Sequence, residues 1–388
     1  MKIFITGATG FLGSSLIQDL LANGHQVTAL VRSKNGRCAL KQLIDSLPEQ
    51  NGAFLHDRAA DQSLQMIEGD VAGERFGLGE STYARLAKNS DFIFHNAACT
   101  KLETDWDIYE KINIGGTREA IKFAAHTPHK MLAHVSSAYV AGNRTQTVRE
   151  DELDLQAGFR NGYEKSKAIS ETAVRQAAAS GKIRTMILRP GIIIADSTNG
   201  KMNEGHHLFD FVFRMFWARQ MIQKRHASSA SGPGDEFRLL GNPEATKNLI
   251  PVNHVAKSIA ALIETDKAWG GSFHLTHPEP ITLHKLLAYV KKSMDWPNIN
   301  FISREIHRKF TPLEQRFFNG VKVYDKYFWQ EPVFDQSQLK AALGGNLQPP
   351  APVCQDSVKR IVDFVRMKYS ERTAQKKNGS LRPALELS

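Results

Sequence analysis

The chain has 388 residues, of which 41% are hydrophobic and 23% charged, and this composition is typical of a globular protein and excludes wholesale disorder. Its formal charge of +10 favours anionic partners, but the absence of a Lys/Arg stripe with interleaved aromatic residues argues against nucleic acid. The three cysteines match neither a disulfide framework nor a zinc pattern, which favours a reducing, cytoplasmic setting, and no apolar run reaches the roughly 18 residues of a membrane span.

Strand-like apolar runs alternate with helix-length segments through the first half of the chain. We expect strands, in chain order, at 2–7, 25–32, 65–71, 91–98, 131–137 and 184–194. Helices are expected between them, at 14–24, 81–89, 116–126 and from about 161 onward. This alternation predicts an α/β fold with a doubly wound parallel Rossmann sheet. After residue 194 the pattern loosens, which indicates a smaller, mostly helical C-terminal substrate region.

A glycine-rich turn, TGATGFLG, stands between the first expected strand and the first expected helix. Gly7 permits the tight exit from the strand, Gly10 leaves room for a pyrophosphate, and Gly13 lets helix and strand pack closely. The helix N-terminus adds free N–H groups and the positive end of its dipole. A turn without a ligand is the alternative, but the position of the motif favours dinucleotide binding. The predicted contacts of the turn are Gly7, Thr9, Gly10, Phe11, Leu12 and Gly13.

The end of the second expected strand bears on the choice of cofactor. It carries Arg32, followed by Lys34 and Arg37, and lacks the acid that usually takes the ribose 2′-hydroxyl of NAD. Because a guanidinium attracts a 2′-phosphate, we predict NADPH (NADP) as the cofactor, with an ordinary surface role for Arg32 as the alternative. The ends of the third and fourth strands are expected beside the adenine ring and the middle of the cofactor. These residues are Asp70, Val71, Asn96, Ala97 and Ala98.

The stretch NGYEKSKAISE sets Tyr163 four residues before Lys167, so both side chains lie on one helix face. We expect the lysine ammonium to favour the phenolate and to lower the phenol pKa from its usual value of about 10. Ser137, at a strand end, offers a second hydroxyl for a carbonyl oxygen, and Asn113 is placed to complete a proton relay through water to Lys167. A coincidental Tyr/Lys pair on an exposed helix is the alternative, and the glycine turn argues against it.

TGATGFLG, NAA, the Asn113 segment, VSS and YEKSK occur in the order and spacing of the extended short-chain dehydrogenases/reductases, which the chain resembles from residue 1 to about 265. The resemblance implies that Ser137, Tyr163 and Lys167 match the catalytic triad and Asn113 its fourth member. It also implies that Tyr163 and Lys167 contact the cofactor, Lys167 through the nicotinamide ribose.

HVSSAYVAG, NGYEKSKAISE, LRPGIII and LIPVNHVA are similar to the thioester-reductase or male-sterility branch, which includes fatty acyl-CoA reductases. LVRSKNGRCALKQL resembles the NADP-binding segment of that branch, with Lys41 as a second basic residue. Further cofactor contacts are expected in LRPGIII, at Pro190, Gly191 and Ile193.

The resemblance implies an NADPH-dependent reductase of an acyl thioester, carried by coenzyme A or by an acidic acyl carrier protein. The product is an aldehyde, or an alcohol after a second hydride. One alternative is another reductase or dehydrogenase of this fold, acting on a ketone, a hydroxysteroid-like alcohol or a nucleotide sugar. A non-catalytic NADP(H)-binding sensor is the other. The sequence leaves the oligomeric state open.

We assign 1–195 and 248–285 to the NADP-binding Rossmann domain and 196–247 and 286–370 to the substrate-binding region, with 371–388 as a mobile, polar tail.

The aromatic segment at 206–225 suits the lid of an acyl pocket or a peripheral contact with a membrane surface, although a helix packed on the main domain is favoured. His206, His207 and His254 show no metal-ligand spacing, so we predict no metal.

Overall fold

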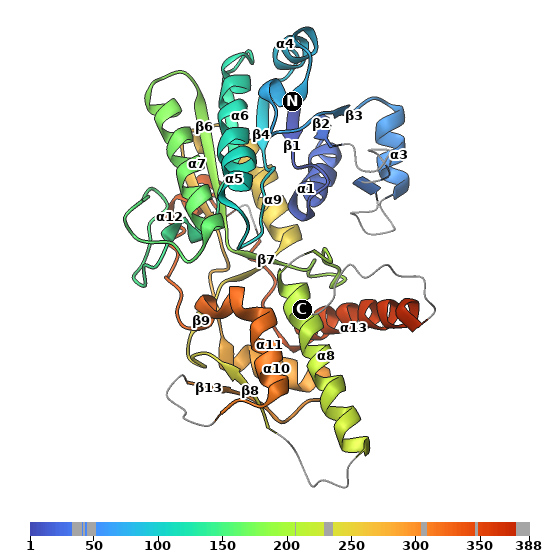
Figure 1. Cartoon of the computed structure of the whole chain (residues 1–388). Helices are drawn as coiled ribbons and strands as arrows, with labels where there is room; N and C mark the ends of the chain where they lie inside the picture. The colour runs from blue at the N-terminus through green and yellow to red at the C-terminus, as the bar shows by residue number, and fades with distance from the viewer. Residues whose placement is uncertain are drawn as a thin grey trace. The chain divides into compact units, whose positions relative to one another are not determined.

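The chain is described from a computed structural model (Figure 1). The structure describes residues 1–32, 41, 43–44, 52–205, 207–228, 236–303, 309–345 and 348–377. Two compact units share the chain. Unit 1 comprises Met1–Ile193, Ile250–Pro278 and Pro332–Pro350, and unit 2 comprises Ile194–Leu249, Glu279–Glu331 and Ala351–Ser388.

Unit 1 is built on a seven-stranded sheet in the order β11-β6-β5-β4-β1-β2-β3, with every pairing parallel. The order reverses between β1 and β4, which is where open sheets of this kind bind dinucleotides. The predicted doubly wound parallel sheet is confirmed. Its strands are β1 (Lys2–Thr6), β2 (Gln26–Val31), β3 (Leu64–Glu68), β4 (Phe92–His95), β5 (Met131–Val135), β6 (Arg184–Pro190) and β11 (Ser272–Leu275).

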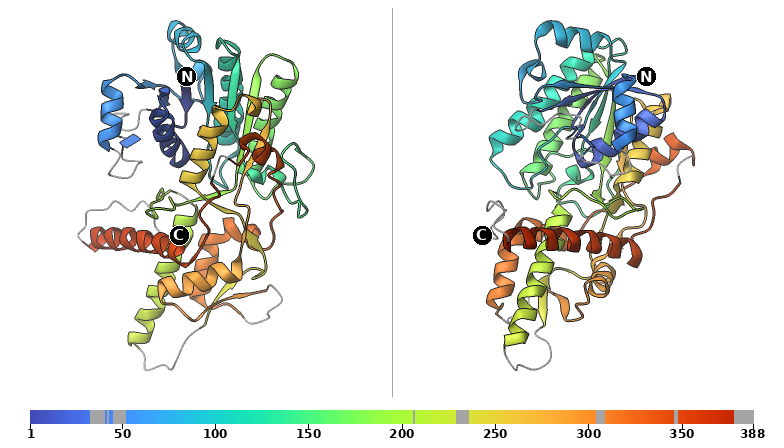
Figure 2. Two further views of the ribbon diagram at one scale, coloured as in Figure 1. Left: turned by 180° about the vertical axis from the view of Figure 1, so that it is seen from behind. Right: turned by 90° about the vertical axis from the view of Figure 1, so that its right-hand side faces the viewer.

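Helices cover both faces of the sheet, as the two views of Figure 2 show. α1 and α9 pack on one face, where Leu16 and Ile259 join the alternate strand residues such as Ile5 in one buried cluster. α6 and α7 pack on the other, where Phe123 joins Phe4. The helices of unit 1 are α1 (Phe11–Ala22), α3 (Gly52–Ala60), α4 (Glu80–Lys88), α5 (Trp106–Tyr109), α6 (Gly116–Ala125), α7 (Gly162–Ala179), α9 (Val252–Ile263) and α12 (Ser337–Leu343), with shorter turns η2 (Glu74–Gly77), η3 (Glu110–Gly115), η4 (Ala138–Ala141) and η5 (Asp266–Ala268).

Unit 2 is mostly helical, with β8 (Phe237–Leu240) and β13 (Ile299–Ile302) as a parallel pair and β9 (Thr246–Lys247) and β12 (Ile281–Thr282) as an antiparallel one. The short strands β7 (Ile192–Ile194) and β10 (Leu249–Pro251) stand at the boundaries between the units. The helices of unit 2 are α8 (His207–Ser228), α10 (Leu283–Met294), α11 (Pro312–Val321), η6 (Lys322–Phe328) and α13 (Gln355–Lys377).

The predicted domain boundaries need three corrections of more than two residues. Residues 279–285, predicted in the Rossmann domain, belong to unit 2. Residues 332–350 belong to unit 1, because the buried carboxylate of Glu150 accepts the N–H groups of Gln338 at 2.6 Å and Leu339 at 3.3 Å. The predicted mobile tail begins too early, because α13 continues to Lys377. The remainder of that tail lies outside the described residues.

The aromatic segment of α8 packs against other helices of unit 2, and the favoured interpretation of a helix packed on the main domain stays a prediction. Its rings pair with α11 and α13: the Phe211 and Phe317 centroids lie 5.8 Å apart, and those of Phe213 and Tyr369 lie 4.8 Å apart. Phe209 is buried. None of the helices in the described part of the chain has the length and apolar character that a bilayer crossing needs.

Candidate active site

In the glycine-rich turn between β1 and α1, backbone packs against backbone where side chains would otherwise stand. Gly7 has φ +73°, and a Cβ there would lie 2.6 Å from the backbone nitrogen of Ala97. A Cβ at Gly13 would lie 2.1 Å from the Gly7 carbonyl oxygen, so only glycine allows α1 to start this close to the turn. Gly10 is the N-cap of α1 and supplies no side-chain cap. The uncapped N–H groups and the helix dipole therefore fit an anionic ligand.

The loop after β4 is hydrogen-bonded to this turn. The Asn96 side-chain amide donates to the Gly7 carbonyl at 3.2 Å, and the Ala97 N–H donates to Thr6 Oγ1 at 3.2 Å. Two of the residues predicted to line the middle of the cofactor thus stand directly beside the glycine-rich turn.

The other predicted cofactor residues follow strands of the same sheet. Arg32 follows β2 and is exposed, as is Lys41, whereas Lys34 and Arg37 lie outside the described residues. The Asp70 carboxylate, after β3, accepts the N–H of Ala72 at 3.0 Å. The remaining predicted cofactor residues are buried or half-buried in unit 1; they are Thr9, Phe11, Leu12, Val71, Ala98, Pro190, Gly191 and Ile193. Their contacts with a cofactor stay predictions.

Two hydroxyl groups meet at the carboxyl end of β5. Ser137 caps η4, and its Oγ accepts the N–H of Tyr139 at 3.2 Å. Tyr163 lies in the first turn of α7, where the N-cap Asn161 accepts the N–H of Glu164 at 3.0 Å. The phenol of Tyr163 hydrogen-bonds the Ser137 side chain. The structure thus brings the predicted serine and tyrosine together.

The pKa of Tyr163 shifts in the direction opposite to the one predicted. Burial raises it to about 12, and the hydrogen bond with Ser137 lowers it by less. The Lys167 ammonium donates to the carbonyl oxygen of Val135 at 2.5 Å, which ties it to the end of β5. Burial lowers the pKa of Lys167 itself to about 8, and the Glu171 carboxylate opposes that shift. The expectation that this phenol is acidic is wrong for this structure, because burial, the largest influence on its pKa, disfavours the phenolate.

Asn113 lies in a π-helical segment, η3, and its side chain is engaged away from Lys167. Its amide oxygen accepts the N–H of Cys99 at 2.7 Å, and its amide nitrogen donates to the Cys99 carbonyl at 3.1 Å and to Ser166 Oγ at 2.8 Å. Asn113 therefore fixes the loop after β4 against α7. The predicted water relay to Lys167 stays a prediction, and the residue acts here as a clamp.

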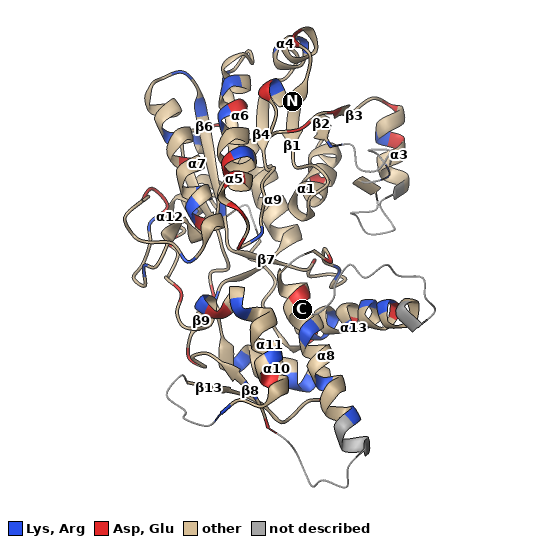
Figure 3. Cartoon of the chain, viewed as in Figure 1, with Lys and Arg blue, Asp and Glu red and all other residues tan. Residues whose placement is uncertain are grey.

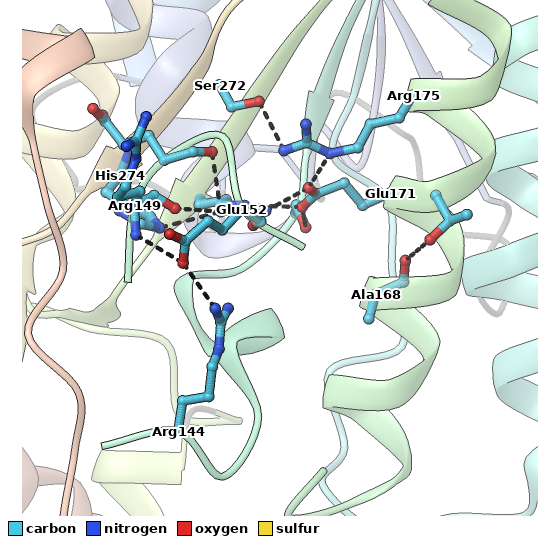
Figure 4. A network of polar contacts seen from close by, with 12 residues as sticks. Arg144, Arg149, Glu152, Ala168, Glu171, Arg175, Ser272 and His274 are labelled. Atoms are coloured by element: carbon cyan, nitrogen blue, oxygen red, sulfur yellow. Dashed lines mark hydrogen bonds and ion pairs between the residues drawn. The ribbon is translucent and has the colours of Figure 1, made fainter. Parts of the chain in front are cut away.

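A buried ionic network holds the strand end that carries Ser137 (Figure 4). Ser136 Oγ donates to Glu171 at 2.7 Å, and Arg189 makes a two-pronged contact with the same carboxylate, at 2.6 and 3.0 Å. Arg175 adds a third cationic contact at 2.8 Å. Glu171 and Arg189 are fully buried. Arg189 also donates to the backbone carbonyl oxygens of Glu150 at 3.1 Å and Glu152 at 2.6 Å, so protein groups stabilise both buried charges.

Sequence reasoning missed this network and a second buried polar group. His95 and His134 are directly paired on β4 and β5, and their rings stack with centroids 5.7 Å apart. The sequence does carry a signal for this group. Alternate residues of each strand face α6 and α7. The last residue on that face of β1, β4 and β5 is polar, whereas the residue two positions earlier is apolar; the polar residues are Thr6, His95 and His134. Glu171 likewise falls one turn after Lys167 on the same helix face.

The strand order, the glycine turn and the Ser137–Tyr163–Lys167 cluster together define an extended short-chain dehydrogenase/reductase, a class of NAD(P)-dependent oxidoreductases. A family model described as "Male sterility protein", an NAD-binding domain, matches residues 5–259, and the chain belongs to this family.

Comparisons with individual proteins agree with that assignment. The chain is 31% identical to the L-2-aminoadipate reductase large subunit of Penicillium chrysogenum over 71% of its own length, and it spans 19% of that much longer relative. Among solved structures, its fold is similar to the terminal R domain of the myxalamid PKS-NRPS pathway, with a TM-score of 0.76, 23% identity and coverage of 98% and 92% of the two chains. An archaeal thiolation-reductase di-domain gives a TM-score of 0.74 at 19% identity, with coverage of 95% and 75%.

Proposed function

We propose that the protein is an NADPH-dependent reductase that converts an acyl thioester, held on a carrier protein, to an aldehyde. The observation that carries the proposal is the hydrogen-bonded pair of Ser137 and Tyr163 at the carboxyl end of β5, next to the buried Lys167. The glycine turn across the switch point would hold the dinucleotide, through the uncapped N-terminus of α1.

Ser137 and Tyr163 offer two hydroxyl donors to one carbonyl oxygen. Charge develops on that oxygen as a thioester is reduced, and preorganised donors stabilise it most in a site that excludes water. Because its pKa is raised to about 12, Tyr163 stays protonated at neutral pH and is a source of the proton. NADPH, when bound, supplies the hydride.

Lys167 restores the tyrosine. Its ammonium lies one helical turn after Tyr163, so it can return a proton to a phenolate formed there. Collapse of the resulting hemithioacetal breaks the C–S bond, and the proton of its hydroxyl group is transferred to the leaving sulfur, so that an aldehyde and a free thiol are released. Ser136, Glu171 and Arg189 keep the strand end in place and take no part in the proton transfers.

The choice of a carrier-bound substrate comes from the names of the similar proteins. One solved structure is a terminal R domain of a PKS-NRPS pathway, and another joins a thiolation domain to a reductase. The excess of positive charge in this chain, +10, suits an acidic carrier. Lys and Arg residues recur along α8 and α13 of unit 2 (Figure 3), which we propose as the substrate-binding region.

A substrate panel tests the proposal. NADPH absorbance is followed with an acyl-carrier thioester, the matching acyl-CoA, an aldehyde and a ketone, while free thiol is titrated in the same samples. We expect the carrier thioester to cause oxidation of NADPH and the release of one thiol for each NADPH consumed. Turnover of the ketone alone would favour the alternative of another reductase of this fold, and binding without turnover of any substrate would favour the sensor.

A further inference from the structure

The side chains of His95 and His134 form a buried pair near the ends of β4 and β5, within reach of the charge of Lys167, the proposed catalytic lysine. They are 1% and 0% exposed, and their rings are nearly parallel, 19° apart. His95 Nδ1 is hydrogen-bonded to Thr6 Oγ1 at 2.9 Å. Among the described residues, His95 Nε2 and both ring nitrogens of His134 have no hydrogen-bond partner within the protein.

Three such nitrogens in one place are unusual, because buried polar atoms in folded proteins nearly always have a protein or water partner. A neutral imidazole has one donor and one acceptor nitrogen, so the pair offers both kinds of site. Protonation of the two imidazoles does not provide partners for these nitrogens. Burial lowers the pKa of His95 to about 3 and that of His134 well below its usual value, and the charge of Lys167 adds to both shifts.

Lys167 also has buried hydrogen-bond donors that need partners. Its ammonium has three N–H donors, and one of them is bonded to the carbonyl of Val135, the residue that follows His134 on β5. Lys167 is 3% exposed, so its remaining donors have little access to bulk solvent.

We propose an internal water site bounded by the ring nitrogens of His95 and His134 and by the Lys167 ammonium. The water accepts an N–H bond from Lys167 and donates to an imidazole nitrogen, which satisfies both groups at once. In this arrangement His95 and His134 are positioning residues: through the water they hold the lysine beneath Tyr163. The site itself does not depend on the proposed function, whereas its effect on catalysis does.

Removing the water should lower the pKa of Lys167. Hydrogen bonds to a charged group favour its charged form, so loss of one destabilises the ammonium. The Glu171 carboxylate on α7 raises the pKa of Lys167, and the Lys167 charge in turn lowers the pKa of the imidazoles on β4 and β5, which are neutral. With Glu171 intact, His134→Phe should move the alkaline limb of the reductase pH profile to lower pH by about one unit, while the KM for NADPH changes little.

The test combines crystal structures with that profile. The wild-type structure should show an ordered water within hydrogen-bonding distance of Lys167 Nζ and of a ring nitrogen of His134 or His95, and His134→Phe should lack it. His134→Gln keeps a polar partner and should restore both the water and the profile. His129→Phe is the control, because the His129 side chain is 61% exposed.

A dry site in a high-resolution wild-type structure would overturn the proposal, even if His134→Phe does not fold. A water that persists in His134→Phe, or an unshifted limb once the water is gone, would overturn the positioning role. If the protein reduces no thioester, the proposed function fails while the crystallographic result still decides whether the water site exists.

Discussion

The ammonium of Lys167 donates to the backbone carbonyl of Val135 at 2.5 Å, which joins α7 to the strand end that carries Ser137. A lysine in this position is held by β5 and desolvated by the surrounding core, and its pKa falls to about 8. Tyr163 is desolvated as well, but its pKa rises to about 12, because burial disfavours the anion. The two groups therefore titrate in the reverse of their ordinary order, lysine first.

This order predicts the pH dependence of reduction. Lys167 must be protonated to restore Tyr163, so kcat should be constant below pH 8 and fall above it as the ammonium is lost. The tyrosine should contribute no limb in this range. We would record kcat against pH together with the ultraviolet absorbance of tyrosinate in the wild type and Tyr163→Phe. A tyrosinate signal specific to the wild type below pH 8 would show that Lys167 does acidify the phenol.

Cofactor preference should depend on Arg32. The side chain is exposed at the end of β2, where a charge-assisted hydrogen bond to a 2′-phosphate is worth about 1.5–3 kcal/mol. Arg32→Ser should lower kcat/KM for NADPH by roughly 10- to 100-fold and leave that for NADH nearly unchanged. Arg85→Ser, an exposed arginine on α4, is the matched control. Equal losses with both cofactors would mean that Arg32 does not read the 2′-phosphate.

The glycine turn should not tolerate a methyl group at Gly13. A Cβ there would stand 2.1 Å from the Gly7 carbonyl oxygen, so the start of α1 must move. We expect Gly13→Ala to weaken NADPH binding by roughly tenfold or more in a fluorescence titration. Gly79→Ala serves as the control, because a Cβ at the N-cap of α4 meets nothing within 4 Å. Unchanged NADPH affinity in Gly13→Ala would contradict the requirement for glycine at this position.

Glu150 should make the folded protein less stable as pH rises. Burial raises its pKa from 4.5 to about 7, so between these values the folded state binds more protons than the unfolded state. Glu150 therefore stabilises the folded state by roughly 3 kcal/mol below pH 4.5. This stabilisation is lost as the pH rises through 7.

Urea denaturation at a series of pH values measures this effect. Glu150→Gln should remove the Glu150 contribution to the slope between pH 4.5 and 7, while the buried histidines, whose pKa values are lowered, keep their contribution of opposite sign. Glu74→Gln, whose side chain is 76% exposed, should leave the slope unchanged. A slope that is the same in Glu150→Gln and the wild type would contradict the assignment.

The sequence was sufficient for the features that repeat along the chain or sit in a short motif. The β-α alternation predicted the parallel sheet, and the glycine spacing predicted the turn that φ +73° at Gly7 confirms. The spacing of Tyr163 and Lys167 correctly put both on one helix. Their pKa values escaped prediction, because desolvation depends on the packing around α7, which no local pattern encodes.

Long-range partners were equally inaccessible. Glu171 meets Arg189 across 18 residues, and Glu150 reaches Gln338 across 188, so each carboxylate has a partner that no spacing rule identifies. The same holds for Asn113, whose clamp on Cys99 depends on how η3 meets the end of β4. The assignment of 332–350 to the Rossmann unit follows from one of these contacts and could not precede it.

The most direct test of the account compares wild type and Tyr163→Phe on one acyl-carrier thioester, with NADPH consumption and free thiol measured in the same reaction. We predict that the wild type consumes NADPH and releases thiol in step, and that Tyr163→Phe binds NADPH with unchanged affinity and releases none. Undiminished release of thiol by Tyr163→Phe would contradict the role of this hydroxyl at the carbonyl.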